Sequence, residues 1–510
     1  MIHRSLAMPR NLAAASAALA VFSVFAGPAP AQDAAPPPTP APAHWGTALA
    51  QDARAFHDAI LDSHPGPVDP ENPGFNAHLE AGLATALDRA RTADSYEAWY
   101  FALQDYAASF DDGHLGLTDW AGMGHVWTAH WPGFLTGLRT GPDGERHEVV
   151  FSRDPAAPPE GAVLIGCDGR PGEALAAEII GRGAGRWTLP SRRAVFASTL
   201  FVDQHNPWVR RAEHCEFRVG TDVRRYALTW RDLPNAVRDE GFAAARSPRF
   251  TAPIGLRTWS GGQWIGLGGF NGDPSSADGI ALTALQTAVE ARAGEIREAP
   301  AVVFDLRGNN GGSSAWINAL ATTLWGEAEV RARAPDALAV DWRPSEKNIA
   351  QLEEYKVLMA SNPELVAWLT TAAEGMRAAR AEGRPLWREP EEDEAAAASP
   401  VGPSPMKART WVLTDSGCAS ACLDAVDLLK ALGATHVGQE TSGDTAYMEI
   451  REEALPGGRV VARLPMKVYR GRPRGDNETY VPAHEWTGAL GDTAGLEAWL
   501  AGLDAAAARR

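Results

Sequence analysis

Two cysteines and a serine lie within five residues in the segment CASAC, residues 418–422. An extended apolar run, TWVLTD, precedes this segment and residues at helical spacing follow it, so the pattern predicts a strand that turns into a helix near Ser420. The first N–H groups of a helix have no intrahelical partner and lie at the positive end of the helix dipole. A hydroxyl there could attack a carbonyl whose oxyanion binds the N–H of Ala421, although a serine at this position could also simply cap the helix.

A glycine-rich loop offers a second N–H donor. The run AVVFDL, residues 301–306, predicts a buried strand that leads through RGNNGGSS into another helix. Gly308, Gly311 and Gly312 allow the backbone to turn an N–H toward a ligand at the start of that helix. Because parallel strands end at the same edge of a sheet, the two helix starts would converge. Such a loop could instead only end the strand or hold a phosphate.

The segment DDGHLGL, residues 111–117, contains a candidate base. A serine hydroxyl is a weak nucleophile that needs a base within hydrogen-bond reach, and histidine, with an ordinary pKa of ~6.5, suits proton transfer near neutral pH. His114 is therefore a candidate base, and a histidine that only caps a turn is the alternative. Cys418 precedes the helix and Cys422 lies one turn inside it, so we expect Ser420 rather than a thiol to be the nucleophile.

The remaining histidines do not predict a metal site. His57 with His64, and His125 with His130, lack a zinc-type spacing and a third ligand. The G-x-S-x-G segment of α/β-hydrolases is also missing from the sequence. We therefore expect neither a metal ion nor an organic cofactor.

The start of the chain predicts export. Residues 1–31 carry two arginines, an apolar stretch from Leu12 to Ala26 and an Ala-Pro-Ala segment, as a signal peptide does. Removing Arg4 and Arg10 would change the formal charge from −17 to −19, and such an acidic balance disfavours nucleic acid as a partner. No later segment has the ~20 apolar residues of a spanning helix, so we expect a periplasmic or secreted protein without an integral membrane segment.

The four cysteines of an exported chain predict disulfide bonds. Four cysteines can pair in three ways that the sequence does not distinguish. We favour Cys167 with Cys215, which leaves Cys418 and Cys422 as a local pair or as free thiols.

Changes of pattern divide the chain into parts. A Pro/Ala-rich tether at 32–44 precedes helical spacing at 45–120, and short strands with one or two helices occupy 121–240. From 250 to 510 strands and helices alternate, which indicates a mainly parallel sheet covered by helices. An insertion at 330–405 interrupts this α/β part and ends in an acidic, Ala/Pro-rich run that we expect to be mobile.

Several segments, in the order that the family has them, resemble the carboxy-terminal processing, or tail-specific, serine peptidases and their tricorn-like relatives. DDGHLGL resembles the D-G-H stretch that holds the histidine base of the tricorn-like branch, and GAVLIGCDGRPGEAL is similar to part of a PDZ domain. FDLRGNNGG resembles the D-L-R-x-N-x-G-G stretch of the family. CASACLDAVDLL resembles the segment that holds the nucleophile, and VGQETSG resembles the strand and turn after it. The matches span residues from about 110 to 445.

The resemblance implies an α/β fold with a crotonase-like (ClpP-like) catalytic core, an N-terminal helical bundle and an inserted PDZ-like β-rich module. It makes Ser420 the nucleophile, His114 the base, and Ala421 with Gly311 or Gly312 the oxyanion donors. The reaction would be hydrolysis of a peptide bond through an acyl-enzyme. The PDZ-like module would take an extended segment of a peptide or protein substrate by strand addition.

One departure from the family pattern bears on the mechanism. Relatives of the Ser/Lys branch have a lysine just after the strand that VGQETSG resembles, and residues 443–445 here read Gly-Asp-Thr, which favours the Ser/His branch. An acid that orients His114 would be Glu478 or, alternatively, Glu440. A non-catalytic peptide-binding protein on the same scaffold is one alternative to an exported serine peptidase, and an esterase or amidase for small molecules is another.

Overall fold

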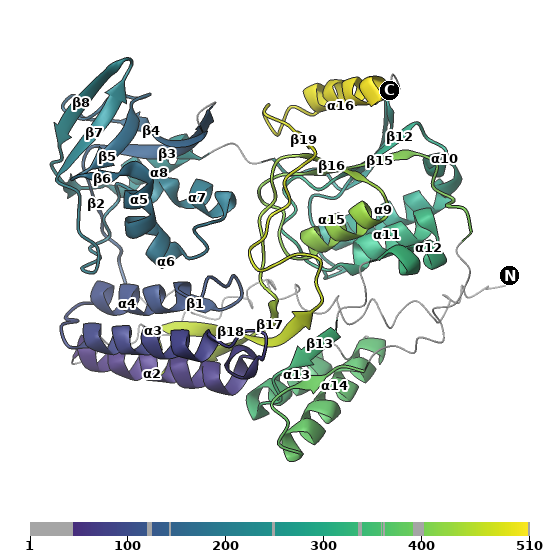
Figure 1. Cartoon of the computed structure of the whole chain (residues 1–510), viewed down its shortest axis with the longest axis horizontal. Helices are drawn as coiled ribbons and strands as arrows, with labels where there is room; N and C mark the ends of the chain where they lie inside the picture. The colour runs from purple at the N-terminus through teal and green to yellow at the C-terminus, as the bar shows by residue number, and fades with distance from the viewer. Residues whose placement is uncertain are drawn as a thin grey trace. The chain divides into compact units, whose positions relative to one another are not determined.

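The computed structural model describes residues 44–119, 125–141, 144–246, 250–334, 339–358, 360, 363–390 and 402–507 (Figure 1). The predicted signal peptide, all but the last residue of the predicted tether and residues 391–401 of the insertion lie outside them. The chain divides into two compact units. The described residues within Pro248–Glu449 and Met466–Arg510 form the α/β unit, and those within Gln32–Ser247 and Ile450–Pro465 form the N-terminal unit.

The α/β unit is built on a six-stranded sheet. Its strands lie in the order β10 (Gly255–Trp259), β11 (Gly262–Gly266), β12 (Ala301–Asp305), β15 (Arg409–Thr414), β16 (Thr435–Gly438) and β19 (His484–Glu485). β10 is antiparallel to β11, and every following pair of neighbours is parallel. The mainly parallel sheet that the alternation of strands and helices predicts is thus confirmed, and β12 and β15 end at the same edge of it.

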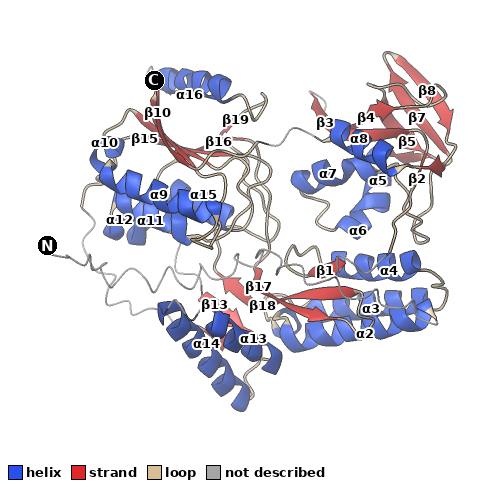
Figure 2. Cartoon of the chain, turned by 180° about the vertical axis from the view of Figure 1, so that it is seen from behind, coloured by secondary structure: helices blue, strands red, loops and turns tan. Residues whose placement is uncertain are grey.

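Helices cover both faces of this sheet (Figures 1 and 2). One face carries α9 (Ala277–Ala291), α10 (Ala293–Arg297), α11 (Ala315–Trp325), α12 (Glu327–Arg333) and α15 (Ala421–Ala431), and α16 (Thr493–Ala507) lies on the other. Side chains alternate along β12, because Val302 and Phe304 pack with the first group of helices whereas Val303 packs with Leu496 of α16. All five residues of β12 are buried, since a strand covered on both faces has no solvent-facing side.

The described part of the insertion is a small folded element with a core of its own. It contains β13 (Ala339–Trp342), α13 (Glu346–Leu358), α14 (Pro363–Ala381) and β14 (Trp387–Arg388). β13 pairs with β14 and with the end of β18 (Val460–Arg470), the strand that follows β17 (Tyr447–Ala454). Trp342, Leu352 and Met376 are fully buried in this core. Its residues form a hydrophobic cluster separate from the clusters that pack on the parallel sheet.

Helices dominate the first part of the N-terminal unit. α2 (Trp45–Ser63), η1 (Gly66–Val68), α3 (Phe75–Ala90) and α4 (Tyr96–Ala108) pack around a core that includes Phe56 and Trp99. The Ser95 hydroxyl accepts the N–H of Ala98 at 3.1 Å and thereby caps the N-terminus of α4. β1 (Gly116–Asp119) follows α4 and pairs antiparallel with the first residues of β18.

The second part of the N-terminal unit is a six-stranded sheet with short helices. β3 (Phe134–Gly141), β4 (Gly144–Ser152), β5 (Val163–Cys167), β7 (His214–Val219) and β8 (Asp222–Ala227) neighbour one another in that order, and β6 (Arg170–Pro171) pairs with β5. The helices are α5 (Gly172–Ala176), η2 (Ala177–Gly181), α6 (Arg182–Ala184), α7 (Pro190–Phe196), η3 (Ala197–Thr199) and α8 (Asn235–Ala245), and a separate ribbon consists of β2 (His130–Trp131) and β9 (Arg231–Asp232). Cys167 and Cys215 lie opposite each other on β5 and β7 and form the predicted disulfide bond.

His147 on β4 makes the stability of the N-terminal unit depend on pH. The residue is 7 % exposed, and burial lowers the pKa of its imidazole from 6.5 to about 4. The unfolded chain therefore takes up a proton in this pH range that the folded chain does not, so the free energy of unfolding falls as the pH drops. We expect His147 to account for a loss of about 2 kcal/mol between roughly pH 7.5 and pH 5.

Urea unfolding of the wild type and of His147→Gln at both pH values measures this contribution. The loss of unfolding free energy on acidification should be smaller in His147→Gln by about 2 kcal/mol, because glutamine does not titrate. Carboxylates elsewhere affect both proteins alike. Equal losses in the two proteins would therefore contradict the prediction.

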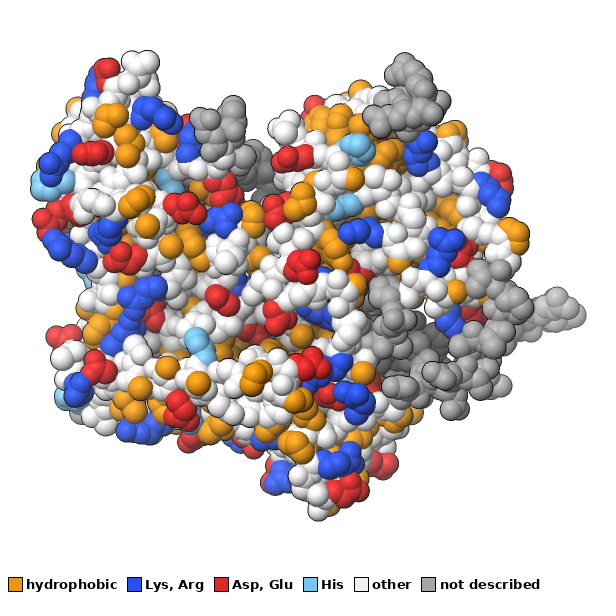
Figure 3. Space-filling model, in the orientation of Figure 1, with side chains coloured by type: hydrophobic (Ala, Val, Ile, Leu, Met, Phe, Trp, Pro, Cys, Tyr) orange, Lys and Arg blue, Asp and Glu red, His pale blue; other side chains and the backbone are white. Residues whose placement is uncertain are grey.

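The described surface mixes charges of both signs. On the face that Figure 3 shows, basic and acidic side chains are interspersed, so the acidic surplus of the sequence is not gathered there in one field. Among the described residues, no helix combines the length and the apolar character that crossing a membrane requires.

Candidate active site

Ser420 lies in the turn that joins β15 to α15, at the sheet edge where the parallel strands end. Its backbone has φ 55° and ψ −128°, a conformation that non-glycine residues rarely adopt and that costs of the order of 1–3 kcal/mol. The residue occupies the N-cap position of α15, but its side chain makes no capping hydrogen bond. The structure therefore does not show the capping role, and the half-buried serine sits in a strained strand-to-helix turn, a geometry in which hydrolases present a nucleophilic serine.

A disulfide bond braces this turn. Cys418 and Cys422 are bonded to each other and fully buried, so neither is a free thiol. Ser442 donates its backbone N–H to the carbonyl of Cys418 at 3.0 Å, which ties the turn to the segment after β16. Of the two alternatives left open for this pair, the structure shows the local bond, and Ser420 lies between the two bonded cysteines.

The glycine-rich loop after β12 runs against the Ser420 turn. A Cβ added at Gly311 would lie 2.8 Å from the Cβ of Ser420 and 3.2 Å from the backbone nitrogen of Ala421. Gly311 and Gly312 have φ values of 109° and 132°, which glycine adopts readily and other residues rarely do. The two helix starts expected at one sheet edge therefore do converge, and the space beside Ser420 admits no side chain at Gly311.

Ala421 and Gly311 differ as hydrogen-bond donors. Ala421 is the first residue of α15, so its N–H has no acceptor within the helix. The N–H of Gly311 donates to Oδ1 of Asn309 at 2.9 Å. Asn309 is itself fully buried and donates through Nδ2 to the carbonyl of Leu267 at 2.7 Å, which holds the loop in place. Ala421 is thus well placed to receive an oxyanion, whereas Gly311 would have to exchange its partner.

Asp415, which no sequence motif indicated, joins the two loops. One of its carboxylate oxygens accepts the N–H of Gly308 at 2.8 Å, and the other accepts the N–H of Gly417 at 2.9 Å. Burial raises the pKa of Asp415, and these two hydrogen bonds oppose the rise. The sequence signal for such a residue is an acid directly after a buried strand.

A buried arginine, Arg474, fixes the start of α15 from another direction. It donates to Oδ1 of Asp424 at 3.0 Å and to the carboxylate of Asp427, both on α15. It also donates to Oδ2 of Asp444 at 3.2 Å. The other oxygen of Asp424 accepts the Ser314 hydroxyl at 2.7 Å, so the network reaches the start of α11. Residues 443–445 are thus held in place by Asp444, which pairs with Arg474.

The two candidate acids of the α/β unit lie on neighbouring segments. Glu440 accepts the hydroxyl of Thr479 through Oε1, and Thr479 directly follows Glu478. Glu478 accepts the N–H of Gly475 through Oε2 at 2.6 Å, within its own loop. Each glutamate therefore has a structural partner of its own.

His114 belongs to the N-terminal unit, in the turn between α4 and β1. Its backbone N–H donates to Oδ1 of Asp112 at 2.7 Å, and its Nδ1 lies 3.8 Å from the same oxygen. The other oxygen of Asp112 lies 3.9 Å from Nε2 of the buried His64. Burial raises the pKa of Asp112, but the neighbouring imidazoles of His64 and His114, together with the hydrogen bond from the backbone N–H of His114, outweigh it and lower the pKa below its ordinary value. Asp112 is therefore an anion beside His114, and its sequence signal is the first part of the D-G-H stretch.

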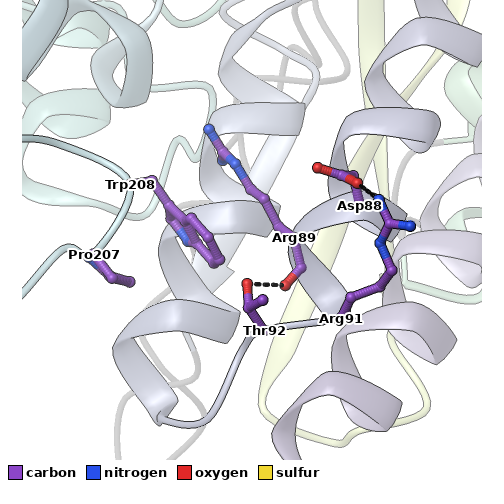
Figure 4. Close-up of a pocket in the computed structure, with 6 residues that line it drawn as sticks. All are labelled: Asp88, Arg89, Arg91, Thr92, Pro207 and Trp208. Atoms are coloured by element: carbon purple, nitrogen blue, oxygen red, sulfur yellow. Dashed lines mark hydrogen bonds and ion pairs between the residues drawn. The ribbon is translucent and has the colours of Figure 1, made fainter.

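A hollow of about 610 Å³ lies in the N-terminal unit beside the end of α3 (Figure 4). It is lined by Asp88, Arg89, Arg91, Thr92, Pro207 and Trp208. The guanidinium of Arg89 lies 5.0 Å from the ring of Trp208, and the Thr92 hydroxyl donates to the carbonyl of Arg89. None of the candidate catalytic residues lines this hollow, so it is separate from the chemistry described above.

No protein-family model matches the sequence, and no curated protein matches it significantly. Among solved structures, mature CPAF in complex with lactacystin matches with a TM-score of 0.53 and 14 % identity, over 86 % of this chain and 94 % of that one. A protein from Bacteroides fragilis described as an S41 protease matches at 13 % identity over 92 % of this chain and 100 % of that one, with a TM-score of 0.34. The photosystem II D1 C-terminal processing protease matches at 12 % identity over 88 % and 94 % of the two chains, with a TM-score of 0.29. Over most of its length, this chain thus has a mixed α/β fold similar to that of mature CPAF.

Proposed function

We propose that the protein is a serine peptidase of the carboxy-terminal processing type, with Ser420 as its nucleophile. The observation that carries the proposal is the strained turn at Ser420, where a serine that does not cap its helix lies against a glycine loop and a helix start. Strained backbone persists where the surrounding structure holds it, and such residues cluster at active sites. Here the disulfide bond between Cys418 and Cys422, on either side of Ser420, holds the strained turn.

The proposed reaction begins when the Ser420 oxygen attacks a peptide carbonyl carbon and its proton passes to His114. The oxyanion accepts the N–H of Ala421 and an N–H of the Gly311–Gly312 loop. The imidazolium then gives its proton to the leaving amine, and an acyl-enzyme remains on Ser420. A water molecule, deprotonated by the same imidazole, hydrolyses this ester and restores the hydroxyl.

A Ser/His mechanism is proposed over a Ser/Lys mechanism because of residues 443–445. Asp444, within this segment, forms ion pairs with Arg472 at 2.8 Å and with Arg474 at 3.2 Å. A lysine introduced there would meet two buried arginines, and like charges in a buried site disfavour each other. We therefore infer that the base comes from another part of the chain and is not a lysine at residues 443–445.

Three carboxylates are candidates for the acid that stabilises the imidazolium. Glu478 and Glu440 are the candidates expected from the sequence, and Asp112 is a third, since it lies beside His114. Asp112 is favoured by its anionic state and by its position beside His114. A carboxylate in this role need not change its protonation state during the reaction.

The similarity of fold to mature CPAF supports the family resemblance that the sequence motifs indicate. We further propose that the α/β unit is a crotonase-like core and that the sheet from β3 to β8 is a PDZ-like module. An extended peptide added to an edge of such a sheet would gain main-chain hydrogen bonds. The substrate would then be a peptide or protein outside the cytoplasm, since the predicted signal peptide implies export.

Labelling with a serine-directed fluorophosphonate tests the proposal. Folded wild-type protein should take up one label, at Ser420, because an activated serine attacks phosphorus as it attacks a carbonyl. Absence of the label would instead support a non-catalytic peptide-binding protein. Turnover of small esters without turnover of any peptide would support an esterase or amidase.

Gly311→Ala should lower kcat/KM by about 10²-fold, which is the effect of losing one oxyanion donor. The new methyl group would lie 2.8 Å from the Cβ of Ser420, so either the serine or the loop must move. The rate of fluorophosphonate labelling should fall in parallel. Peptide hydrolysis and labelling of the variant and the wild type measure both effects.

Gly433→Ala is the matched control for this change. Gly433 follows α15 with φ 96°, so alanine there meets a similar backbone strain, but a Cβ at this position has nothing within 4 Å. Its kcat/KM should stay within a few-fold of the wild type. Similar losses in both variants would mean that backbone strain alone explains the effect of Gly311→Ala.

A further inference from the structure

Two histidines and an aspartate from separate segments of the N-terminal unit meet beside β2. His130, Asp203 and His205 each offer one ligand atom, these atoms all lie within 4.8 Å of one another, and all three residues are half-buried. In the sequence, His130 has only His125 nearby and no third ligand at a metal-binding spacing. The structure brings the other ligands from a loop far along the chain.

The backbone holds His130 and Asp203 opposite each other. The N–H of His130 donates to the carbonyl of Asp203 at 2.8 Å, and the N–H of Asp203 donates to the carbonyl of His130 at 2.9 Å. On its other edge β2 pairs with β9, where Asp232 lies opposite His130. Directly opposed residues of antiparallel strands have Cβ atoms about 4.5–5.5 Å apart. The imidazole therefore has a carboxylate on each side of it.

His205 is turned toward the same point by its backbone. Its N–H donates to Oδ1 of Asp203 at 2.9 Å, and its φ of 62° reverses the chain. The rings of His130 and His205 lie 4.6 Å apart at an angle of 84°. The edge of one ring thus faces the other, an arrangement in which two ring nitrogens can approach one ion.

Each imidazole has one nitrogen held by an outer partner. Nε2 of His130 lies 3.0 Å from Oδ1 of Asp232, and Nε2 of His205 lies 3.0 Å from the hydroxyl of Thr128. Histidines that bind metals show this pattern, because a hydrogen bond at one nitrogen fixes the tautomer and leaves the lone pair of the other nitrogen for the ion. Because Nε2 of each ring already has a partner, Nδ1 of each ring would be the atom that binds the ion.

The guanidinium of Arg211 already contacts two of the three candidate ligands. Nη2 of Arg211 lies 3.1 Å from Nδ1 of His130, and its Nε contacts the carboxylate of Asp203. A guanidinium has donors only, so Nδ1 of His130 acts as an acceptor here. The side chain of Arg211 is 40 % exposed and lies 5.6 Å from the ring of Trp230, so it can leave the cluster for solvent and the indole face.

We propose that His130, Asp203 and His205 bind a divalent transition-metal ion of the zinc type, which displaces the guanidinium of Arg211. Imidazole and carboxylate ligands suit such ions. Neighbouring ligand atoms of a tetrahedral zinc ion with bonds of ~2.1 Å are about 3.4 Å apart. Side-chain rotations that move each ligand atom by about an ångström would therefore bring the three atoms to this spacing. The ion would clip the loop at 203–205 to the ribbon of β2 and β9, a role separate from the proposed hydrolysis.

Titration of the full-length protein with zinc ion, followed by calorimetry, tests the proposal, and cobalt(II) absorption reports the ligand geometry. The wild type should bind one zinc ion per chain. His205→Ala and Asp203→Asn should each weaken binding by about 100-fold or more, because each removes a ligand. Asp232→Asn should weaken zinc binding by about 10-fold or more, because Asp232 orients the imidazole of His130. Arg211→Gln should tighten it by about 10-fold, because the competing cation is gone.

His214→Ala is the matched control for the ligand variants. His214 lies in the same unit with a carboxylate oxygen of Asp168 3.9 Å from its Nδ1, and its side chain is 43 % exposed. Zinc affinity should be unchanged in this variant. Thermal unfolding with and without zinc shows whether each variant is folded, and zinc should raise the Tm of the wild type and of Arg211→Gln but not of His205→Ala. Lack of zinc binding by both wild type and Arg211→Gln, or binding that His205→Ala leaves unchanged, would overturn the proposal.

Discussion

Ser420→Ala should reduce kcat for peptide hydrolysis by about 10⁴-fold or more. The substitution removes the oxygen that forms the acyl-enzyme and leaves only the backbone donors of Ala421 and the glycine loop, which stabilise charge but do not attack. Alanine and serine meet the same strain at φ 55°, so the Tm should change little. Initial rates on a fluorogenic peptide, together with thermal unfolding, measure both quantities.

Ser416→Ala is the control on the same loop. Ser416 is half-buried like Ser420 and precedes it in the segment between β15 and α15. Its replacement should leave kcat within a few-fold of the wild type. If Ser420→Ala retained a rate close to that of the wild type while folded, the proposed nucleophile would be wrong. Equal large losses in the two variants would point to damage of the loop.

His114→Ala should lower kcat/KM by about 10³-fold at neutral pH, the scale of a general base. The wild-type kcat/KM should fall as the pH drops below roughly 7, because a histidine base is inactive once it is protonated. The variant should lose this limb of the pH profile, and a merely structural histidine would not remove it. Profiles of kcat/KM between roughly pH 5 and pH 9 measure the effect.

His78→Ala is the matched control for the base. His78 is an exposed histidine of α3 in the same unit, and its Nε2 lies 3.0 Å from the hydroxyl of Ser109. Both the rate and the pH profile of this variant should match the wild type. A wild-type profile that is flat near neutral pH and rises only in the alkaline range would show that a group other than His114 takes the serine proton.

Local patterns along the chain determine the elements around the candidate nucleophile. The apolar run before CASAC and the helical spacing after it predict β15 and α15, because side-chain periodicity follows directly from strand and helix geometry. The shared edge of a parallel sheet predicts that the two helix starts converge, and Gly311 against Ser420 confirms it. The favoured pairing of Cys167 with Cys215 is confirmed as well.

Pairings between distant segments were decided by the tertiary structure. Asp415 and Gly308 meet because two parallel strands end in register, and Asp424 meets Arg474 because a helix start packs against a distant loop. The same holds for Asp112, whose carboxylate lies 3.9 Å from Nε2 of the buried His64.

The sequence by itself determined where a serine, a glycine loop and a histidine turn occur, because each depends on a few consecutive residues. Tertiary structure alone decided which polar groups share a site, as with His130 and the ligands at 203–205. The physical reason is that a buried polar group needs a partner, and strand register and packing, which local periodicity does not encode, select the partner.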